Sequence, residues 1–122
     1  MRYVEAFVAI ASEQFSQTVR FYQALLAQSP NQLLPDKYAE WVLKGGLKLG
    51  VFYPQDGHRA EFQADQAGPM SLCFEVENLD AAVDCLTALG FPPTGLVQTA
   101  SHGREVYAYD PEGNRLILHQ GD

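Results

Sequence analysis

The sequence predicts an α+β fold built from two consecutive βαβββ modules. Three observations support this: strand and helix patterns alternate along the 122 residues, each half has the order strand, helix, three strands, and the halves align with each other. A shift of 64 residues pairs Glu13 with Glu77 and Val19 with Val83 as identities. We therefore expect a single domain over residues 1–122, with module 1 at about 1–56, a linker at about 57–68 and module 2 at about 69–122.

The first module opens with a β-rich run at 4–11, and a helix follows it. The apolar stripe of this helix has spacings of four, three and four residues and consists of Phe15, Val19, Tyr22 and Leu26. Since serine is a better N-cap than Gln14, we expect the helix to begin at Ser12 or Ser16. Three strands are expected after it, at 33–34, 38–43 and 47–53.

A two-residue turn at Gly45-Gly46 is predicted between the last two strands of this module. Such a turn pairs Trp41 with Gly50, and directly opposed residues share a face of the sheet. We therefore expect Trp41, Gly50 and Phe52 to lie together on the face that points away from the helix.

The second module repeats this order. A strand is expected at 71–76, and Asn78 is a favourable N-cap for the helix after it. Apolar residues from Leu79 to Leu89 form the helical stripe, which Gly90 ends. Short strands are expected at 95–98, 106–109 and 115–119.

Composition and charge narrow the classes of partner. The chain is 47% hydrophobic and 19% charged, as in ordinary globular proteins, and its net charge is −7. A negative field repels nucleic acid and anionic membranes, so neither is an expected partner. The sequence has no apolar run of the roughly 20 residues that a membrane span needs and no signal-peptide pattern, so a cytoplasmic location is expected. Cys73 and Cys85 lack a C-x-x-C spacing and are interpreted as two buried free thiols, with a disulfide or redox pair as the alternative.

Three segments resemble the vicinal oxygen chelate superfamily, which contains glyoxalase I, bleomycin resistance proteins and extradiol dioxygenases. They are Phe-Tyr-Gln-Ala-Leu-Leu at 21–26, Leu-Cys-Phe-Glu-Val-Glu-Asn-Leu-Asp at 72–80 and Asp-Pro-Glu-Gly-Asn at 110–114. The resemblance covers nearly the whole chain. It implies curved mixed sheets around a cleft, in a protein that often forms a homodimer.

Strand alternation indicates which side chains face this cleft. Apolar residues such as Leu116 and Leu118 suit the helix side, which leaves the alternate positions for a ligand. In addition, Arg104 has a guanidinium group that suits an anionic part of a ligand. The predicted ligand-binding residues are Glu5, Phe7, Trp41, Phe52, Ser71, Glu75, Arg104, Tyr107, Tyr109 and His119.

The resemblance also locates the positions that hold metal ligands in metal-dependent relatives. Here these positions are Phe7, Gly50, Ser71 and Ile117. Three of these residues have no side-chain donor atom, and a neutral hydroxyl is a poor ligand for a divalent ion. We therefore expect no metal and no other cofactor, and the sequence leaves open whether the protein is an enzyme.

The functional prediction is a metal-free protein that binds a small aromatic or cationic organic molecule, as the metal-free bleomycin resistance proteins do. One alternative is a metal-dependent lyase or dioxygenase with a relocated site, for which Glu5, Glu75 and His119 are candidate donors. A second alternative is a non-catalytic assembly or regulatory module whose cleft is filled by its own side chains, with Trp41 above Gly50.

Overall fold

The computed structural model describes residues 1–63 and 67–122 and confirms the predicted α+β class. The chain divides into two compact units, Met1–Gln63 and Ala64–Asp122. The elements of the first unit are β1 (Val8–Ala11), α1 (Phe15–Leu26), β2 (Gln32–Leu34), β3 (Tyr38–Val42), β4 (Lys48–Phe52) and the 3₁₀ helix η1 (Asp56–Phe62). Those of the second unit are β5 (Leu72–Glu75), α2 (Leu79–Ala88), β6 (Gln98–Ala100), β7 (Gly103–Tyr109) and β8 (Arg115–Gln120).

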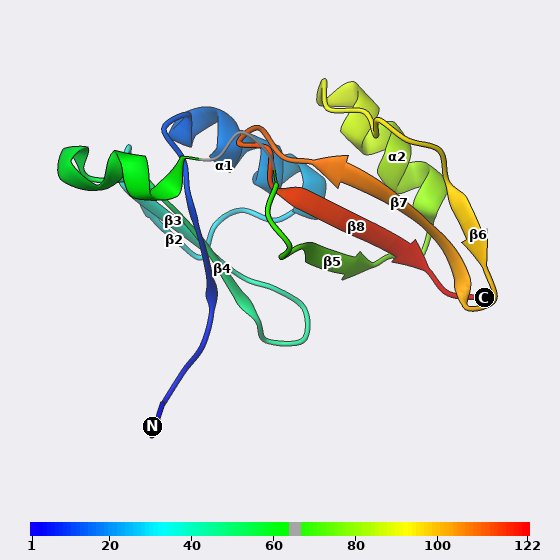
Figure 1. Ribbon diagram of the computed structural model, residues 1–122, viewed down its shortest axis with the longest axis horizontal. Helices are drawn as coiled ribbons and strands as arrows, with labels where there is room; N and C mark the ends of the chain where they lie inside the picture. The colour runs from blue at the N-terminus through cyan, green and yellow to red at the C-terminus, as the bar shows by residue number, and fades with distance from the viewer. Residues whose placement is uncertain (64–66) are drawn as a thin grey trace. The chain divides into compact units, whose positions relative to one another are not determined.

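Each unit holds one four-stranded sheet, and the two sheets have the same topology (Figure 1). The strand orders are β1-β4-β3-β2 and β5-β8-β7-β6. In each sheet the first strand pairs in parallel with the last strand, and the other pairs are antiparallel. The parallel pairs follow from the helical crossovers, because a chain that returns in the same direction needs a long connection.

The core of the first unit lies between α1 and one face of its sheet. The helix contributes Phe15, Val19 and Tyr22, all at most 8% exposed. Alternate residues of β3 and β4 meet them, and these are the fully buried Ala39, Trp41, Leu49 and Val51. We call the opposite face of this sheet, and of its counterpart, the helix-free face.

The second unit is built in the same way. Leu79 and Leu86 of α2 are fully buried, as are alternate residues of β7 and β8, namely Val106, Ala108, Leu116 and Leu118. The predicted N-cap is confirmed, because the Asn78 side chain accepts a hydrogen bond from the backbone N–H of Ala81 at 3.0 Å. The predicted orientations of the strands at 106–109 and 115–119 are also confirmed.

Some predicted boundaries differ from the structure. Helix α1 has Gln14 as its N-cap, without a side-chain cap, instead of Ser12 or Ser16. Ser12 instead extends β1, because its N–H donates to the carbonyl of Phe52 at 2.8 Å, and its buried hydroxyl donates to Thr18 Oγ1 at 2.9 Å. Part of the predicted linker forms η1, and its residues 64–66 lie outside the described residues.

The β3–β4 hairpin has a different register from the predicted one. Trp41 opposes Leu49, and Gly50 opposes Glu40. The turn spans three residues, because the Leu43 N–H donates to the Leu47 carbonyl at 2.8 Å. A one-residue shift turns every side chain of a strand to the other face. The prediction that Trp41 faces the cleft is therefore wrong: its side chain is fully buried against α1.

Two further findings concern burial and membranes. Cys73 is exposed on β5, in contrast to its predicted burial, and Cys85 of α2 is half-buried. Among the described residues, no helix has the length and apolarity needed to cross a membrane.

Candidate functional site

The helix-free face of the second sheet has rows of side chains that run across β5, β8 and β7. One row is Glu75, His119 and Glu105, and the next is Cys73, Ile117 and Tyr107. Of the predicted ligand residues in these rows, Tyr107 is 42% exposed. The strand register thus brings Glu75, Tyr107 and His119 to one surface, as the alternation predicted.

His119 and Glu75 form a close pair on this face. Nδ1 of His119 lies 2.6 and 2.7 Å from the two carboxylate oxygens of Glu75. An ionised carboxylate only accepts hydrogen bonds, so Nδ1 carries a proton and donates it. The ring of His102 stacks on that of His119 with centroids 5.0 Å apart. Nε2 of His119 is buried, and none of the described residues forms a hydrogen bond of standard geometry with it.

These surroundings favour the protonated imidazole. The hydrogen bond to Glu75 is the largest influence that raises the pKa of His119, and the negative charges of Glu75 and Glu105 and the backbone of His102 add to it. Burial acts in the opposite direction, but the net shift of the pKa is upward. Glu75 is therefore balanced by a neighbouring positive charge whenever His119 is protonated.

Arg115 occupies the other end of this face, opposite Tyr109. Its Nη1 donates to the carbonyl of Gly68 at 2.9 Å and to the Ser71 hydroxyl at 3.2 Å. The predicted ligand residue Ser71 is thus hydrogen-bonded to a guanidinium group. Tyr109, another predicted ligand residue, is half-buried opposite Arg115.

Arg104 lies elsewhere. It shares the parity of Val106 and Ala108, which puts it on the helix-covered face. There its Nη1 lies 3.5 Å from Oδ1 of Asp80 on α2. The structure therefore does not bring Arg104 together with the other predicted ligand residues of this unit.

In the first unit, the corrected hairpin register changes the composition of the helix-free face. Tyr38, Glu40 and Val42 of β3 now lie on it, opposite Phe52, Gly50 and Lys48 of β4. Of the predicted residues, Phe52 lies on this face, half-buried. Glu5 forms a salt bridge of 2.7 Å with Lys48 Nζ, and Phe7 precedes β1 with half of its surface exposed.

Tyr38 is the central residue of this face. Its hydroxyl donates to Oε1 of Glu40 at 2.8 Å. Burial, the hydrogen bond to Glu40 and the charges of Glu40 and Glu5 together raise the pKa of Tyr38 to about 12, so the phenol is neutral at physiological pH. Next to it, Phe52 meets the ring of Phe62 from η1 edge-on, with centroids 5.2 Å apart.

Four residues of these faces were missed by sequence reasoning: Tyr38, Glu40, Phe62 and Glu105. For Tyr38 and Glu40 a signal existed, because the assumed register put the Glu40 carboxylate on the apolar face against the helix. Glu105 directly precedes the strand expected at 106–109, and alternation with Val106 and Ala108 indicates its orientation. No local pattern indicates that Phe62 contacts Phe52.

The four positions of the metal pattern do not fit a metal ion. Gly50 has no donor, and the ring of Tyr38 fills the space where a side chain would project: a Cβ on Gly50 would lie 2.8 Å from Tyr38 Oη. Ser71 accepts a hydrogen bond from the Arg115 guanidinium, which opposes a second cation there. Phe7 and Ile117 have hydrocarbon side chains.

A relocated site is not supported either. Glu5 is bonded to Lys48, whereas Nδ1 of His119 is bonded to Glu75. Within residues 1–63 and 67–122, no three His, Cys, Asp or Glu side chains come together in a way that could hold a metal ion.

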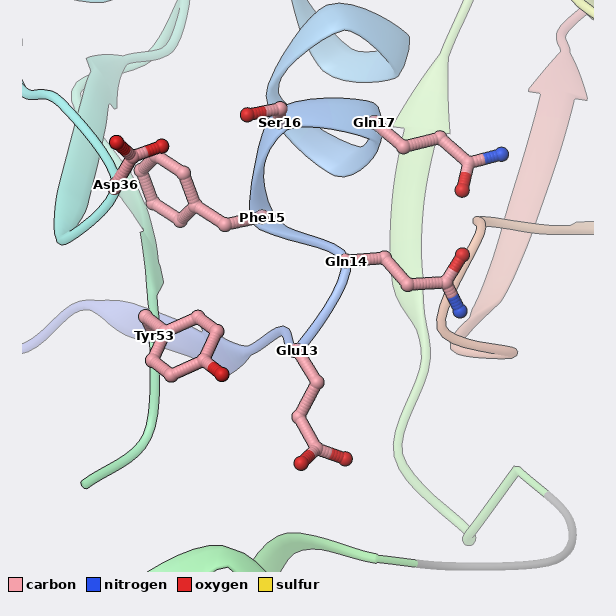
Figure 2. A pocket seen from close by; sticks show the side chains of 7 residues that line it. All are labelled: Glu13, Gln14, Phe15, Ser16, Gln17, Asp36 and Tyr53. Atoms are coloured by element: carbon pink, nitrogen blue, oxygen red, sulfur yellow. The ribbon is translucent and has the colours of Figure 1, made fainter. Parts of the chain in front are cut away.

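A depression of about 510 Å³ lies at the start of α1 in the first unit. Figure 2 shows Gln14 and Gln17 extending away from the rings of Phe15 and Tyr53. The residues that line the depression are Glu13, Gln14, Phe15, Ser16, Gln17, Asp36 and Tyr53. None of them is a predicted ligand residue, and the depression is separate from the helix-free face of the sheet, since Phe15 lies on the helix side.

Comparisons with known proteins agree with this architecture. A glyoxalase/bleomycin resistance protein from Catenulispora acidiphila is 22% identical, with 98% of this chain and 100% of that chain covered and a TM-score of 0.70. A glyoxalase-related enzyme from Fulvimarina pelagi is 19% identical over 99% of this chain and 89% of that chain, with a TM-score of 0.78. The fosfomycin resistance protein FosX from Listeria monocytogenes is 18% identical over 100% and 94% of the two chains, with a TM-score of 0.77. At these identities the likeness shows the fold alone.

A search of curated proteins found no match. The sequence profile of one family, however, matches residues 6–118, which is most of the chain. Together with the two βαβββ units, this match identifies the protein as a member of the Glyoxalase/Bleomycin resistance protein/Dioxygenase superfamily.

Proposed function

We propose that the protein binds a small aromatic or cationic organic molecule without a metal ion, on the helix-free faces of its sheets. The main support is the chemistry of the metal-ligand positions: Tyr38 covers Gly50, and Arg115 is bonded to Ser71. These residues leave aromatic rings and carboxylates as the recognition groups of the two faces.

The aromatic groups are suited to such a ligand because they are not used in the core. Phe7 and Phe62 are each about half exposed, and Tyr107 is 42% exposed. Carboxylates accompany them on both faces, Glu40 in the first unit and Glu105 in the second. Exposed rings beside carboxylates can attract a cation through both the ring quadrupole and charge.

Titration of the protein with three small probes of matching ring structure tests this proposal. The probes are benzyltrimethylammonium, neutral benzyl alcohol and anionic benzoate, and the readout is amide chemical shifts. Binding of the first two, localised to β3, β4, β7 and β8, supports the proposal. An absence of shifts with all three probes contradicts it.

The same titration after exhaustive treatment with EDTA addresses the enzymatic alternative. A crystal structure of Listeria monocytogenes FosX, 17% identical to this chain, contains Mn(II) and a dihydroxypropylphosphonic acid. Binding that is unchanged by EDTA is expected here. Binding lost with EDTA and restored by Mn²⁺ or Zn²⁺ would instead favour a metal-dependent lyase or dioxygenase.

One observation favours the second alternative, a non-catalytic module with a filled cleft. The ring of Tyr38 occupies the space above Gly50 and so covers part of its own sheet. An interaction module would bind none of the three probes.

Homodimer formation is part of our proposal as well, and light scattering of the purified chain measures it directly.

A further inference from the structure

The arrangement of Tyr38, Glu40 and Gly50 carries an inference that rests on the proposed function and makes it more specific. We infer that Tyr38 is the recognition platform for a quaternary or alkylated ammonium group, which packs against its ring beside the Glu40 carboxylate. The ligand class is thereby narrowed from aromatic or cationic molecules to organic monocations.

Glycine at position 50 leaves room for the ring of Tyr38. A Cβ on Gly50 would lie 2.8 Å from Tyr38 Oη, 3.1 Å from Cε1 and 3.3 Å from Cζ. Real Cβ atoms do not approach other atoms so closely, so the observed placement of the ring requires glycine at position 50. The hydroxyl end of the ring therefore lies over position 50 of β4, and the Tyr38 side chain as a whole is half-buried.

A hydrogen bond orients the phenol end of this ring. The hydroxyl donates to Glu40 Oε1 at 2.8 Å, on the same face and two residues along β3. Because this hydrogen bond already orients the side chain, the ring loses less freedom when a ligand packs on it. Preorganisation of this kind favours the binding of a ligand that packs on the ring.

The electrostatics favour a positive charge. Tyr38 stays neutral because its pKa is about 12, and a phenol bonded to a carboxylate keeps the negative face of its ring. Glu40 and Glu5 contribute two negative charges to this face and Lys48 contributes one positive charge, which leaves a net charge of about −1. One excess negative charge beside an aromatic ring matches an organic monocation.

The neighbouring rings define the rest of the platform. Phe52 directly opposes Tyr38 across the strands, and Phe62 meets Phe52 edge-on at 5.2 Å. Phe62 is 50% exposed and belongs to η1, which Arg59 ties to the Tyr53 hydroxyl at 2.7 Å. Aromatic residues therefore extend from β3 across β4 to η1, and they suit the apolar part of a cationic ligand.

Binding constants for benzyltrimethylammonium and benzyl alcohol in four variants test this inference. Tyr38→Leu removes the ring, and Gly50→Ala displaces it. We expect each to weaken binding of the cation by about three- to thirtyfold and to change binding of the alcohol by no more than about twofold. Tyr38→Phe keeps the ring and should retain most of the affinity for the cation.

Gly57→Ala is the matched control for Gly50→Ala. Gly57 has an ordinary backbone conformation, and a Cβ there would meet nothing within 4 Å. Circular dichroism and amide spectra verify the fold of each variant. Should Gly50→Ala fail to fold, Tyr38→Leu and Tyr38→Phe still decide between a platform and a filler.

The possible outcomes separate this inference from the proposed function. Equal affinity for cation and alcohol, or an unchanged preference in Tyr38→Leu, overturns the platform while leaving small-molecule binding intact. No binding of either probe to the wild-type protein overturns both. A preference for the cation that Tyr38→Leu and Gly50→Ala abolish, and Gly57→Ala preserves, supports both.

Discussion

Replacement of Trp41 distinguishes a core residue from a ligand-binding one. The indole is fully buried, its ring centroid lies 6.2 Å from that of Tyr22, and its Nε1 donates to the carbonyl of Gln28 at 2.9 Å. Trp41→Ala removes this packing and this hydrogen bond together. Truncation of a buried aromatic side chain costs about 3–5 kcal/mol. That is a large part of the ~5–15 kcal/mol by which a typical domain is stable.

Two further variants divide this loss into its parts. Trp41→Phe keeps an aromatic ring but deletes the hydrogen bond to Gln28, so we expect it to lower the free energy of unfolding by about 1–2 kcal/mol. Tyr107→Ala is the comparison on the helix-free face. Because Tyr107 is 42% exposed, its removal should cost about 1 kcal/mol or less.

Urea denaturation followed by far-UV circular dichroism measures all three free energies, since Trp41→Ala removes the only tryptophan and with it the fluorescence signal. The expected order of loss is Trp41→Ala, then Trp41→Phe, then Tyr107→Ala. A loss below about 1 kcal/mol for Trp41→Ala would refute the core assignment. It would also refute the hairpin register that produces this assignment.

Three other measurements follow from the structure. Because the pKa of His119 is raised in the folded protein, the contribution of this residue to stability is complete below about pH 6.5 and is lost as the pH rises through the folded-state pKa. Imidazole NMR titration should show the raised pKa of His119, and Glu75→Gln should lower that pKa. An unchanged pKa of His119 in Glu75→Gln would contradict the pairing of the two residues. Asn78→Ala removes the side-chain cap of α2 and should cost about 1 kcal/mol in urea denaturation, with Asn78→Asp retaining most of the stability. Asp110 is 3% exposed and accepts hydrogen bonds of 2.9 Å from the backbone N–H groups of Glu112 and Asn114. Asp110→Ala should therefore lower the free energy of unfolding by about 2–4 kcal/mol, and a loss of less than about 0.5 kcal/mol would show that the turn forms without this side chain.

Much of the fold could be predicted because its signals are local. Leu116 and Leu118 lie between the polar Arg115 and His119, which fall on the other face, so the last strand could be oriented from sequence. Asn78 stands directly before an apolar helical stripe, which made the start of α2 predictable. Alternation also assigned Glu75 and His119 to the side of the predicted cleft, whereas their contact depends on the pairing of β5 with β8, which the structure shows.

The first unit was harder to predict because the residue types alone do not determine the length of its β3–β4 turn. Gly45 and Gly46 both have positive φ, as a two-residue turn requires, yet the turn also includes Lys44. Because of this extra residue the register shifts by one, so Tyr38 and Glu40 lie on the helix-free face in place of Trp41. The start of α1 was missed for another reason: Ser12 forms a backbone hydrogen bond with β4, a long-range contact that helix-capping preferences do not include.

The parallel pairing of first and last strands has a consequence for folding during synthesis. In its sheet, β1 pairs with β4 alone, and Val8 is the partner of Leu49. The β1–β4 hydrogen bonds therefore cannot form until Leu49 has been synthesised. Strand β5 waits in the same way, from Leu72 to Leu116. Each sheet thus closes only when its last strand leaves the ribosome. All ladder pairs of the first sheet join residues between Val8 and Phe52, so this half can complete its sheet while the second half is still being translated.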